Sequence, residues 1–203
     1  MPKMKWIGLT GGIATGKSTV SRVLESRGYP VVDADAIVHR LLLPGQTAFR
    51  NVVNHFGTPI LNSSGQIDRK ILGEIVFKNS LERKTLESLI HPEVQKEVSR
   101  ERQEFEMEGE RYSFYDVPLL FENSLTSQFD LVVTVWCDLK QQLSRLKARS
   151  KLSEQQAYER IATQLPLIEK VKASDYCIDN SGIDSELIYI VNGFCDQLDR
   201  NRI

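Results

Sequence analysis

The chain has few cysteines, and their spacing excludes the two roles that cysteines most often perform together. Cys137, Cys177 and Cys195 are the three cysteines of the sequence, and no Cys-x-x-Cys pair occurs. An odd number of widely separated thiols argues against a disulfide framework and against a zinc site. These cysteines are typical of a protein that works in a reducing compartment.

The chain also lacks an excess of positive charge and any long apolar run. Its 26 basic and 27 acidic residues give a net charge of −1 at pH 7. Proteins that bind nucleic acids or membrane surfaces usually carry a basic excess, so we expect neither partner. The longest apolar stretches, such as residues 131–137, are far shorter than the roughly 20 residues of a membrane-spanning helix. A glycine-rich run from Gly8 leaves no room for a secretion signal, which predicts a cytoplasmic protein.

What is present is the composition of a globular protein, with 203 residues of which 41% are hydrophobic and 26% charged. Five short segments are typical of strands, namely residues 5–10, 30–33, 112–117, 130–137 and 175–179. The fourth, DLVVTVWC, is almost continuously apolar, as expected for a strand that is buried on both faces of a parallel sheet. Helical patterns separate the strands, which predicts an α/β fold with right-handed crossovers.

Two connections between these strands are too long for simple crossovers, so we predict three parts. Residues 35–109 are helix-rich and form a helical insertion, and residues 138–165 form a helical lid. The remaining residues, 1–34, 110–137 and 166–203, make a core with a five-stranded parallel sheet.

The lid is predicted as a helical hairpin from two capping patterns. Asp138 is followed after three residues by a glutamine, and so is Ser153, which is typical of helix N-termini. These caps predict helices over residues 139–150 and 154–164, and Pro166 is expected to end the second.

The strongest motif is a glycine-rich loop that directly follows the first predicted strand. Gly11-Gly12-Ile13-Ala14-Thr15-Gly16-Lys17-Ser18 satisfies the P-loop pattern G-x-x-x-x-G-K-[ST], and Thr19 continues it into a helix. Its glycines let backbone N–H groups turn inward toward an anion. Lys17 supplies charge at the β- and γ-phosphates, and Ser18 a hydroxyl ligand for Mg²⁺. The motif predicts a nucleoside triphosphate such as ATP and leaves the class of enzyme open.

The charge of the predicted lid indicates which class of nucleotide-binding enzyme the chain resembles. Residues 138–172 contain eight basic and four acidic side chains, and Arg145 and Arg149 share one helix face. Small-molecule kinases use such a mobile basic lid to neutralise the phosphates and exclude water, although a solvated helix face would show the same pattern. The guanine signature Asn-Lys-x-Asp is absent from the sequence, which disfavours a GTPase.

Acidic residues stand where two predicted strands end, the edge at which open α/β sheets bind ligands. Asp33 could accept a proton from an acceptor hydroxyl or hold the Mg²⁺ shell, whereas we expect Asp35 to be the N-cap of the next helix. Asp116 could assist Mg²⁺ or serve only as a structural residue at the strand end.

Six segments together resemble one family. They are GGIATGKS at 11–18, DADAIVHRLL at 33–42, HPEV at 91–94, DVPLLFE at 116–122, RIATQ at 160–164 and DYCIDNSG at 175–182. In this order and spacing they make the whole chain similar to the dephospho-CoA kinase family. The P-loop is generic, whereas DAD with the downstream VPLLFE is far more specific to the family. One departure is Ile13-Ala14-Thr15, where many members have a further glycine and a serine.

The resemblance implies an activity and a set of site residues. Members transfer the γ-phosphoryl group of ATP, with Mg²⁺, to the ribose 3′-hydroxyl of dephospho-CoA, the last step of coenzyme A biosynthesis. It implies that Asp33 is the base, that Arg145 reaches the phosphates, and that Asn180 and Gly182 lie near the adenine. Lys17 of the loop and Arg149 of the predicted lid are expected to bind the nucleotide as well. The residues it implies for the acceptor are Asp33, His91, Leu119, Leu120, Phe121 and Glu122, and we expect Arg160 of the predicted lid to contact the acceptor too.

Two other functions remain open at this stage. A nucleoside or nucleotide kinase would use the same loop and lid, and a non-catalytic ATP-binding switch would use the lid to signal to a partner. A monomer or a weak homo-oligomer is expected. His39 and His91 have no nucleophile at a recognisable spacing, so each could equally be a structural histidine.

Overall fold

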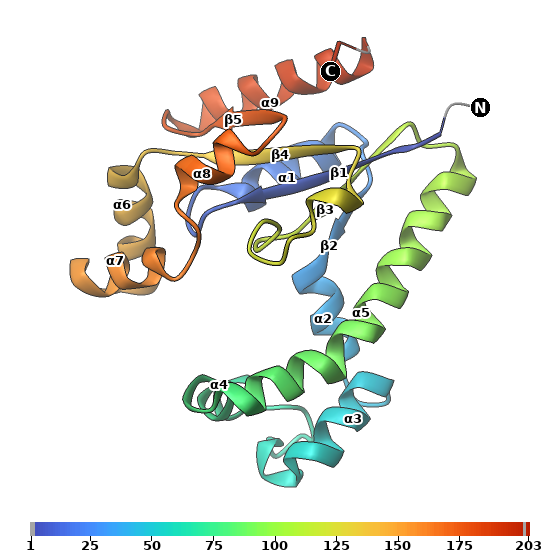
Figure 1. Cartoon of the computed structure of the whole chain (residues 1–203), viewed down its shortest axis with the longest axis vertical. Coiled ribbons are helices and arrows are strands. Elements are labelled where there is room, and N and C mark those ends of the chain that lie inside the picture. The colour runs from blue at the N-terminus through green and yellow to red at the C-terminus, as the bar shows by residue number, and fades with distance from the viewer. Residues whose placement is uncertain (1–2, 201) are drawn as a thin grey trace. The chain divides into compact units, whose positions relative to one another are not determined.

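The computed structural model describes residues 3–200, 202 and 203, and the chain divides into two compact units (Figure 1). One unit runs up to Val32 and resumes at Phe105, and the other comprises Asp33–Glu104. The three-part division predicted above stays a prediction. Within the described residues, no helix has both the length and the apolar character that a membrane crossing requires.

The first unit is built on a five-stranded sheet in the order β2-β3-β1-β4-β5. The strands are β1 (Lys5–Gly11), β2 (Val31–Asp33), β3 (Tyr112–Asp116), β4 (Leu131–Trp136) and β5 (Tyr176–Asp179). Strand β1 pairs in parallel with β3 and β4, and β4 pairs in parallel with β5. The predicted strands and the parallel sheet are therefore confirmed, and the carboxyl ends of the central strands meet at one edge.

Alternation along the strands gives the sheet two apolar faces. On one face, Ile7, Leu9 and Phe114 pack with apolar residues of α1 (Lys17–Ser26) and α9 (Asp184–Asp199). On the other face, Trp6 stacks on Tyr115 and on Phe129, with ring centroids 5.6 and 6.4 Å apart. Burial on both faces explains why the central strands have nearly continuous apolar sequences.

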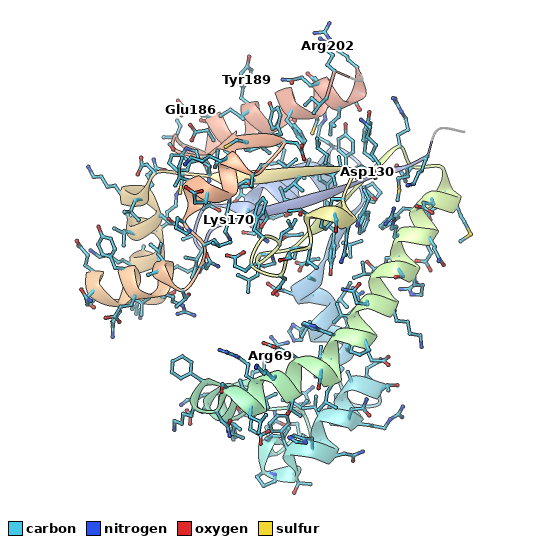
Figure 2. All side chains as sticks on the ribbon, in the orientation of Figure 1. Arg69, Asp130, Lys170, Glu186, Tyr189 and Arg202 are labelled. Carbon is cyan, nitrogen blue, oxygen red and sulfur yellow. The ribbon has the colours of Figure 1, made fainter. Side chains whose placement is uncertain are left out.

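An aspartate stands before each of two strands and joins it to the neighbouring strand. The carboxylate of Asp130, labelled in Figure 2, accepts the N–H of Trp6 at 2.8 Å. The carboxylate of Asp175 accepts the N–H of Val132 at 2.7 Å in the same way. These bonds fix the register at the amino ends of the strands, so that the carboxyl ends are correctly aligned at the site.

Three helices lie between β4 and β5, namely α6 (Leu139–Ser150), α7 (Glu154–Ala162) and α8 (Leu167–Lys172). Both predicted caps are confirmed, because Asp138 accepts the N–H of Gln141 and Ser153 forms a reciprocal capping box with Gln156. The prediction was wrong about the end of the second helix and the role of Pro166. Helix α7 ends at Ala162, and Pro166 is the N-cap of α8, where the lost proline N–H costs nothing.

The second unit contains the helices α2 (Ala34–Leu41), α3 (Thr47–Phe56), η1 (Thr58–Ile60), α4 (Arg69–Lys78) and most of α5 (Ser80–Glu108). Arg40 of α2 forms an ion pair with Glu101 of α5. The predicted N-cap was wrong: α2 begins at Ala34, so Asp33 is the N-cap and accepts the N–H of Ala36 at 3.0 Å, while Asp35 lies in the first turn.

Burial of a thiol in the first unit predicts how stability depends on pH. Cys195 is fully buried in the core, and burial raises the pKa of its thiol from 9.0 to about 11. Above pH 9 the unfolded chain loses this proton while the folded chain keeps it, so the unfolded state binds fewer protons. We expect the free energy of unfolding to fall by up to about 2 kcal/mol between pH 9 and pH 11.

Urea unfolding at pH 8, 9, 10 and 11 measures this loss of stability. Cys195→Ala is expected to make the fall between pH 9 and pH 10 shallower. Burial also raises the pKa of Tyr29, so a further fall above pH 10 should persist in that variant. An unchanged slope in Cys195→Ala would contradict the assignment to this thiol.

Candidate active site

The glycine-rich loop lies where β1 leads into α1, at the carboxyl edge of the sheet. Gly16 adopts a left-handed conformation (φ 94°, ψ 16°) and is the N-cap of α1. Thr15 closes the turn, because its hydroxyl donates to the Gly12 carbonyl at 2.9 Å. Ser18 is exposed in the first turn, and the Thr19 hydroxyl accepts from Arg22 at 3.2 Å. A helix N-terminus facing such a loop is a site for phosphate.

Two residues of the loop have demanding backbone positions. A Cβ atom on Gly16 would overlap the side-chain nitrogen of Asn180, so only glycine fits there. Ala14 has a positive φ of 60°, a region that costs an L-residue about 1–2 kcal/mol. The departure noted at Ala14 therefore keeps the glycine-like conformation without the glycine.

Lys17 and Asp116 come together at the end of β3. They form an ion pair, and Asp116 is only 4% exposed. Its second carboxylate oxygen accepts the hydroxyl of Ser21 at 2.7 Å, so the carboxylate is fixed from two sides. This arrangement positions the ammonium group at the loop.

The segment after β5 is hydrogen-bonded to the backbone of the P-loop. Asn180 is 3% exposed, and its side-chain nitrogen donates to the Thr15 carbonyl at 2.8 Å. Arg145 of α6 donates to the Asn180 carbonyl at 3.0 Å and contacts the Gly182 carbonyl at 3.5 Å. The structure thus brings together three predicted residues, Arg145, Asn180 and Gly182, around the P-loop.

The basic side chains counted in residues 138–172 include both exposed and buried groups. Arg149 and Arg160 are exposed. Lys170 of α8, labelled in Figure 2, has a fully buried side chain, pairs with Glu122 at 2.7 Å and donates to the Gly11 carbonyl at 3.3 Å. Lys170 is one of the eight basic residues counted in residues 138–172. Including it in the charge available to the phosphates was wrong, because its charge is neutralised in the interior.

The DVPLLFE segment follows β3. Leu119 is 39% exposed, whereas Leu120 is fully buried, where a side chain on Gly8 would overlap it. Phe121 is half-buried, and Glu122 accepts the N–H of Leu165 at 3.1 Å as well as the lysine. Contact between this segment and an acceptor stays a prediction.

Two predicted residues, Asp33 and His91, belong to the second unit. Asp33 is exposed apart from its capping bond, and His91 is exposed on α5, one residue before Pro92 within the helix. Their predicted roles are not tested by the geometry of either unit.

Comparison with known proteins shows the family of the chain that carries this loop. A family model described as dephospho-CoA kinase matches residues 5–186. The chain belongs to the dephospho-CoA kinase family. A family member from Carboxydothermus hydrogenoformans is 48% identical over 176 residues, which are 87% of this chain and 85% of that protein. Membership makes the chain an enzyme, a kinase.

Solved structures agree with membership of the dephospho-CoA kinase family. The dephospho-CoA kinase from Campylobacter jejuni has a TM-score of 0.74 and 28% identity, covering 98% of both chains. The shikimate kinase from Acinetobacter baumannii, with a TM-score of 0.53 and 15% identity over 98% of this chain and 96% of that one, shares the fold. The predicted P-loop kinase fold is confirmed.

Sequence reasoning missed two kinds of residue in this site. Lys170 is one, since a lysine in a basic stretch carries no sign of burial. Gln142 and Gln164 are the others: Gln164 ends the RIATQ segment, but neither glutamine was given a role, and both bond to the backbone of Ile13.

Proposed function

We propose that this protein phosphorylates the ribose 3′-hydroxyl of dephospho-CoA with ATP, giving coenzyme A and ADP. The observation that carries the proposal is the P-loop with its paired Lys17 in a chain that matches the dephospho-CoA kinase family over nearly its whole length. Both substrates are polyanions, and the net charge of the protein is −1, so local positive groups must bind them.

The proposed nucleotide site consists of the loop and the residues around it. Backbone N–H groups of the loop and the N-terminus of α1 would hold the phosphates. Lys17, Arg145 and Arg149 would offset the charge that develops during transfer, and Asn180 and Gly182 would border the adenine.

Asp33 is the proposed general base. The acceptor hydroxyl oxygen would form a bond to the γ-phosphorus while the bond from that phosphorus to the ADP oxygen breaks. The hydroxyl proton would pass to the Asp33 carboxylate. Among the described contacts this carboxylate makes one hydrogen bond, in which it accepts the N–H of Ala36, so its second oxygen is available.

Mg²⁺ is the metal that the donor set fits best. Ser18 offers an exposed hydroxyl and Asp116 a carboxylate, both hard oxygen ligands, and Mg²⁺ usually takes few protein ligands and completes its shell with phosphate and water. Bound Mg²⁺ would neutralise phosphate charge.

The acceptor is proposed to contact the second unit and the segment after β3. The residues concerned are His91, Leu119, Leu120, Phe121, Glu122 and Arg160, of which Leu120 is fully buried. The helical insertion would bind the acceptor, and the hairpin would act as the lid. We further propose that the protein is cytoplasmic and is a monomer or a weak homo-oligomer. It is proposed to bind neither nucleic acid nor membrane.

A coupled ADP-release assay tests this function. We expect ADP to form when dephospho-CoA is supplied, and at least 100-fold less with nucleoside monophosphates or other hydroxyl acceptors. Equal turnover with a nucleoside monophosphate would instead favour a nucleotide kinase. Tight ATP binding without turnover on any acceptor would favour a non-catalytic switch.

A further inference from the structure

Two glutamines bond to the two peptide groups that flank Ile13 in the P-loop. The side-chain nitrogen of Gln142 donates to the Ile13 carbonyl at 2.7 Å. The Ile13 N–H donates to the side-chain oxygen of Gln164 at 2.8 Å. Both backbone groups of one loop residue are therefore held by side chains from a distant part of the chain.

The glutamines come from the two ends of the helical hairpin. Gln142 lies in the first turn of α6 and is 3% exposed. Gln164 follows the end of α7 and precedes Pro166. Because the hairpin lies between them, the loop backbone is tied to the hairpin at both points where the hairpin leaves the core.

These bonds determine where the next backbone N–H points. In a trans peptide the carbonyl oxygen and the following N–H point in opposite directions. Holding the Ile13 carbonyl toward Gln142 thus aims the Ala14 N–H away from α6, toward the other side of the loop. The positive φ of Ala14 is an unfavourable conformation that needs such support from its surroundings.

The cavity that both amides line has uncharged walls. Both glutamines line a cavity of about 500 Å³ whose other walls include Trp136, Tyr158 and Leu165, with no charged side chain in the lining. An uncharged amide can donate or accept there without adding charge beside a site for polyphosphate. Glutamine supplies both functions, as donor at 142 and as acceptor at 164.

We propose that Gln142 and Gln164 are positioning residues that set the P-loop conformation for ATP and couple it to the hairpin. They act through the backbone of Ile13 and Ala14 and do not touch the reacting atoms. This inference rests on the proposed ATP-dependent activity, and it is specific to the nucleotide half of the reaction.

Removal of either bond with little change of shape tests the proposal. In Gln142→Met and in Gln164→Met we expect the KM for ATP, and the Kd for ATP from calorimetry, to rise about tenfold. The kcat at saturating ATP should fall less than threefold, and the KM for the acceptor should change less than twofold. Gln155→Met is the control, because Gln155 bonds to Glu159 within α7. It should leave both constants for ATP within twofold of the unaltered protein.

Two further comparisons separate positioning from a general loss of structure. Both glutamines hold the same residue. The Kd for ATP of the double Met variant should therefore be at most twofold higher than that of the single Met variant that binds ATP more weakly. Glu at either position adds the same charge, but only Gln164→Glu keeps its acceptor, so Gln142→Glu should bind ATP at least fivefold more weakly than Gln164→Glu. If circular dichroism shows that a Met variant does not fold, the two Glu variants decide.

The proposal is overturned if both Met variants bind ATP within twofold of the unaltered protein, if their effects multiply in the double variant, or if the two Glu variants bind ATP equally. Calorimetry needs no acceptor, so a failure of turnover with dephospho-CoA would refute the proposed function and leave this test intact.

Discussion

Asp33→Asn is expected to abolish most turnover while leaving ATP binding and the fold unchanged. A positioned general base contributes about 10²–10⁴-fold to rate, so kcat with dephospho-CoA should fall by that factor. Asn is as good an N-cap as Asp and can still accept the N–H of Ala36, so the thermal midpoint should stay the same. Steady-state kinetics, ATP calorimetry and thermal unfolding measure the three quantities.

Two variants serve as controls for this result. Asp35→Asn changes a carboxylate two residues away in the same helical turn and should leave kcat within about threefold. Asp33→Ala removes both the base and the cap, so it should lose turnover and about 1 kcal/mol of stability. If Asp33→Asn kept more than a tenth of the original kcat, Asp33 would not be the base.

Lys170→Met is expected to lower the free energy of unfolding by about 3–5 kcal/mol. The side chain of Lys170 is fully buried, and its partner Glu122 is 19% exposed. Loss of the ammonium group leaves a largely buried carboxylate with one oxygen that already lacks a hydrogen-bond partner among the described residues. Removal of one partner of a buried ion pair usually costs this much. Chemical denaturation of the purified variant measures the effect.

The double variant Lys170→Met with Glu122→Gln separates the ion pair from simple packing. It should recover at least half of the loss, because neither partner then leaves an uncompensated charge. Lys172→Met, in which an exposed lysine paired with Glu169 is removed, should change stability by less than about 0.5 kcal/mol. A double variant no more stable than Lys170→Met would contradict the ion-pair explanation.

The strands and the P-loop were predictable because their signals are local. Apolar runs marked all five strands to within about two residues, and the spacing from Gly11 to Ser18 located the loop between β1 and α1. The capping pairs at Asp138 and Ser153 likewise marked where the two hairpin helices begin. In these segments the neighbouring residues along the chain carry the information.

The errors arose where a tertiary contact or a backbone detail decided the outcome. Lys170 has a polar sequence context, and only Glu122 and the Gly11 carbonyl explain its burial. Asp33 and Asp35 are both good caps, and the choice depended on where β2 ended. Gln142 and Gln164 bond to a residue more than 120 positions away, which no local pattern could reveal.

The strand order has a consequence for how the chain is made. The neighbours of β1 in the sheet are β3 and β4, and β3 begins only at Tyr112. During synthesis at about 5–20 residues per second, an apolar strand that includes Trp6 and Ile7 would wait roughly 5–20 seconds for its first partner. The P-loop follows directly from that strand, so this loop cannot take its final shape until more than half of the chain has left the ribosome. Long-range parallel pairing of this kind folds slowly. Nascent chains should therefore need protection from aggregation until β3 emerges.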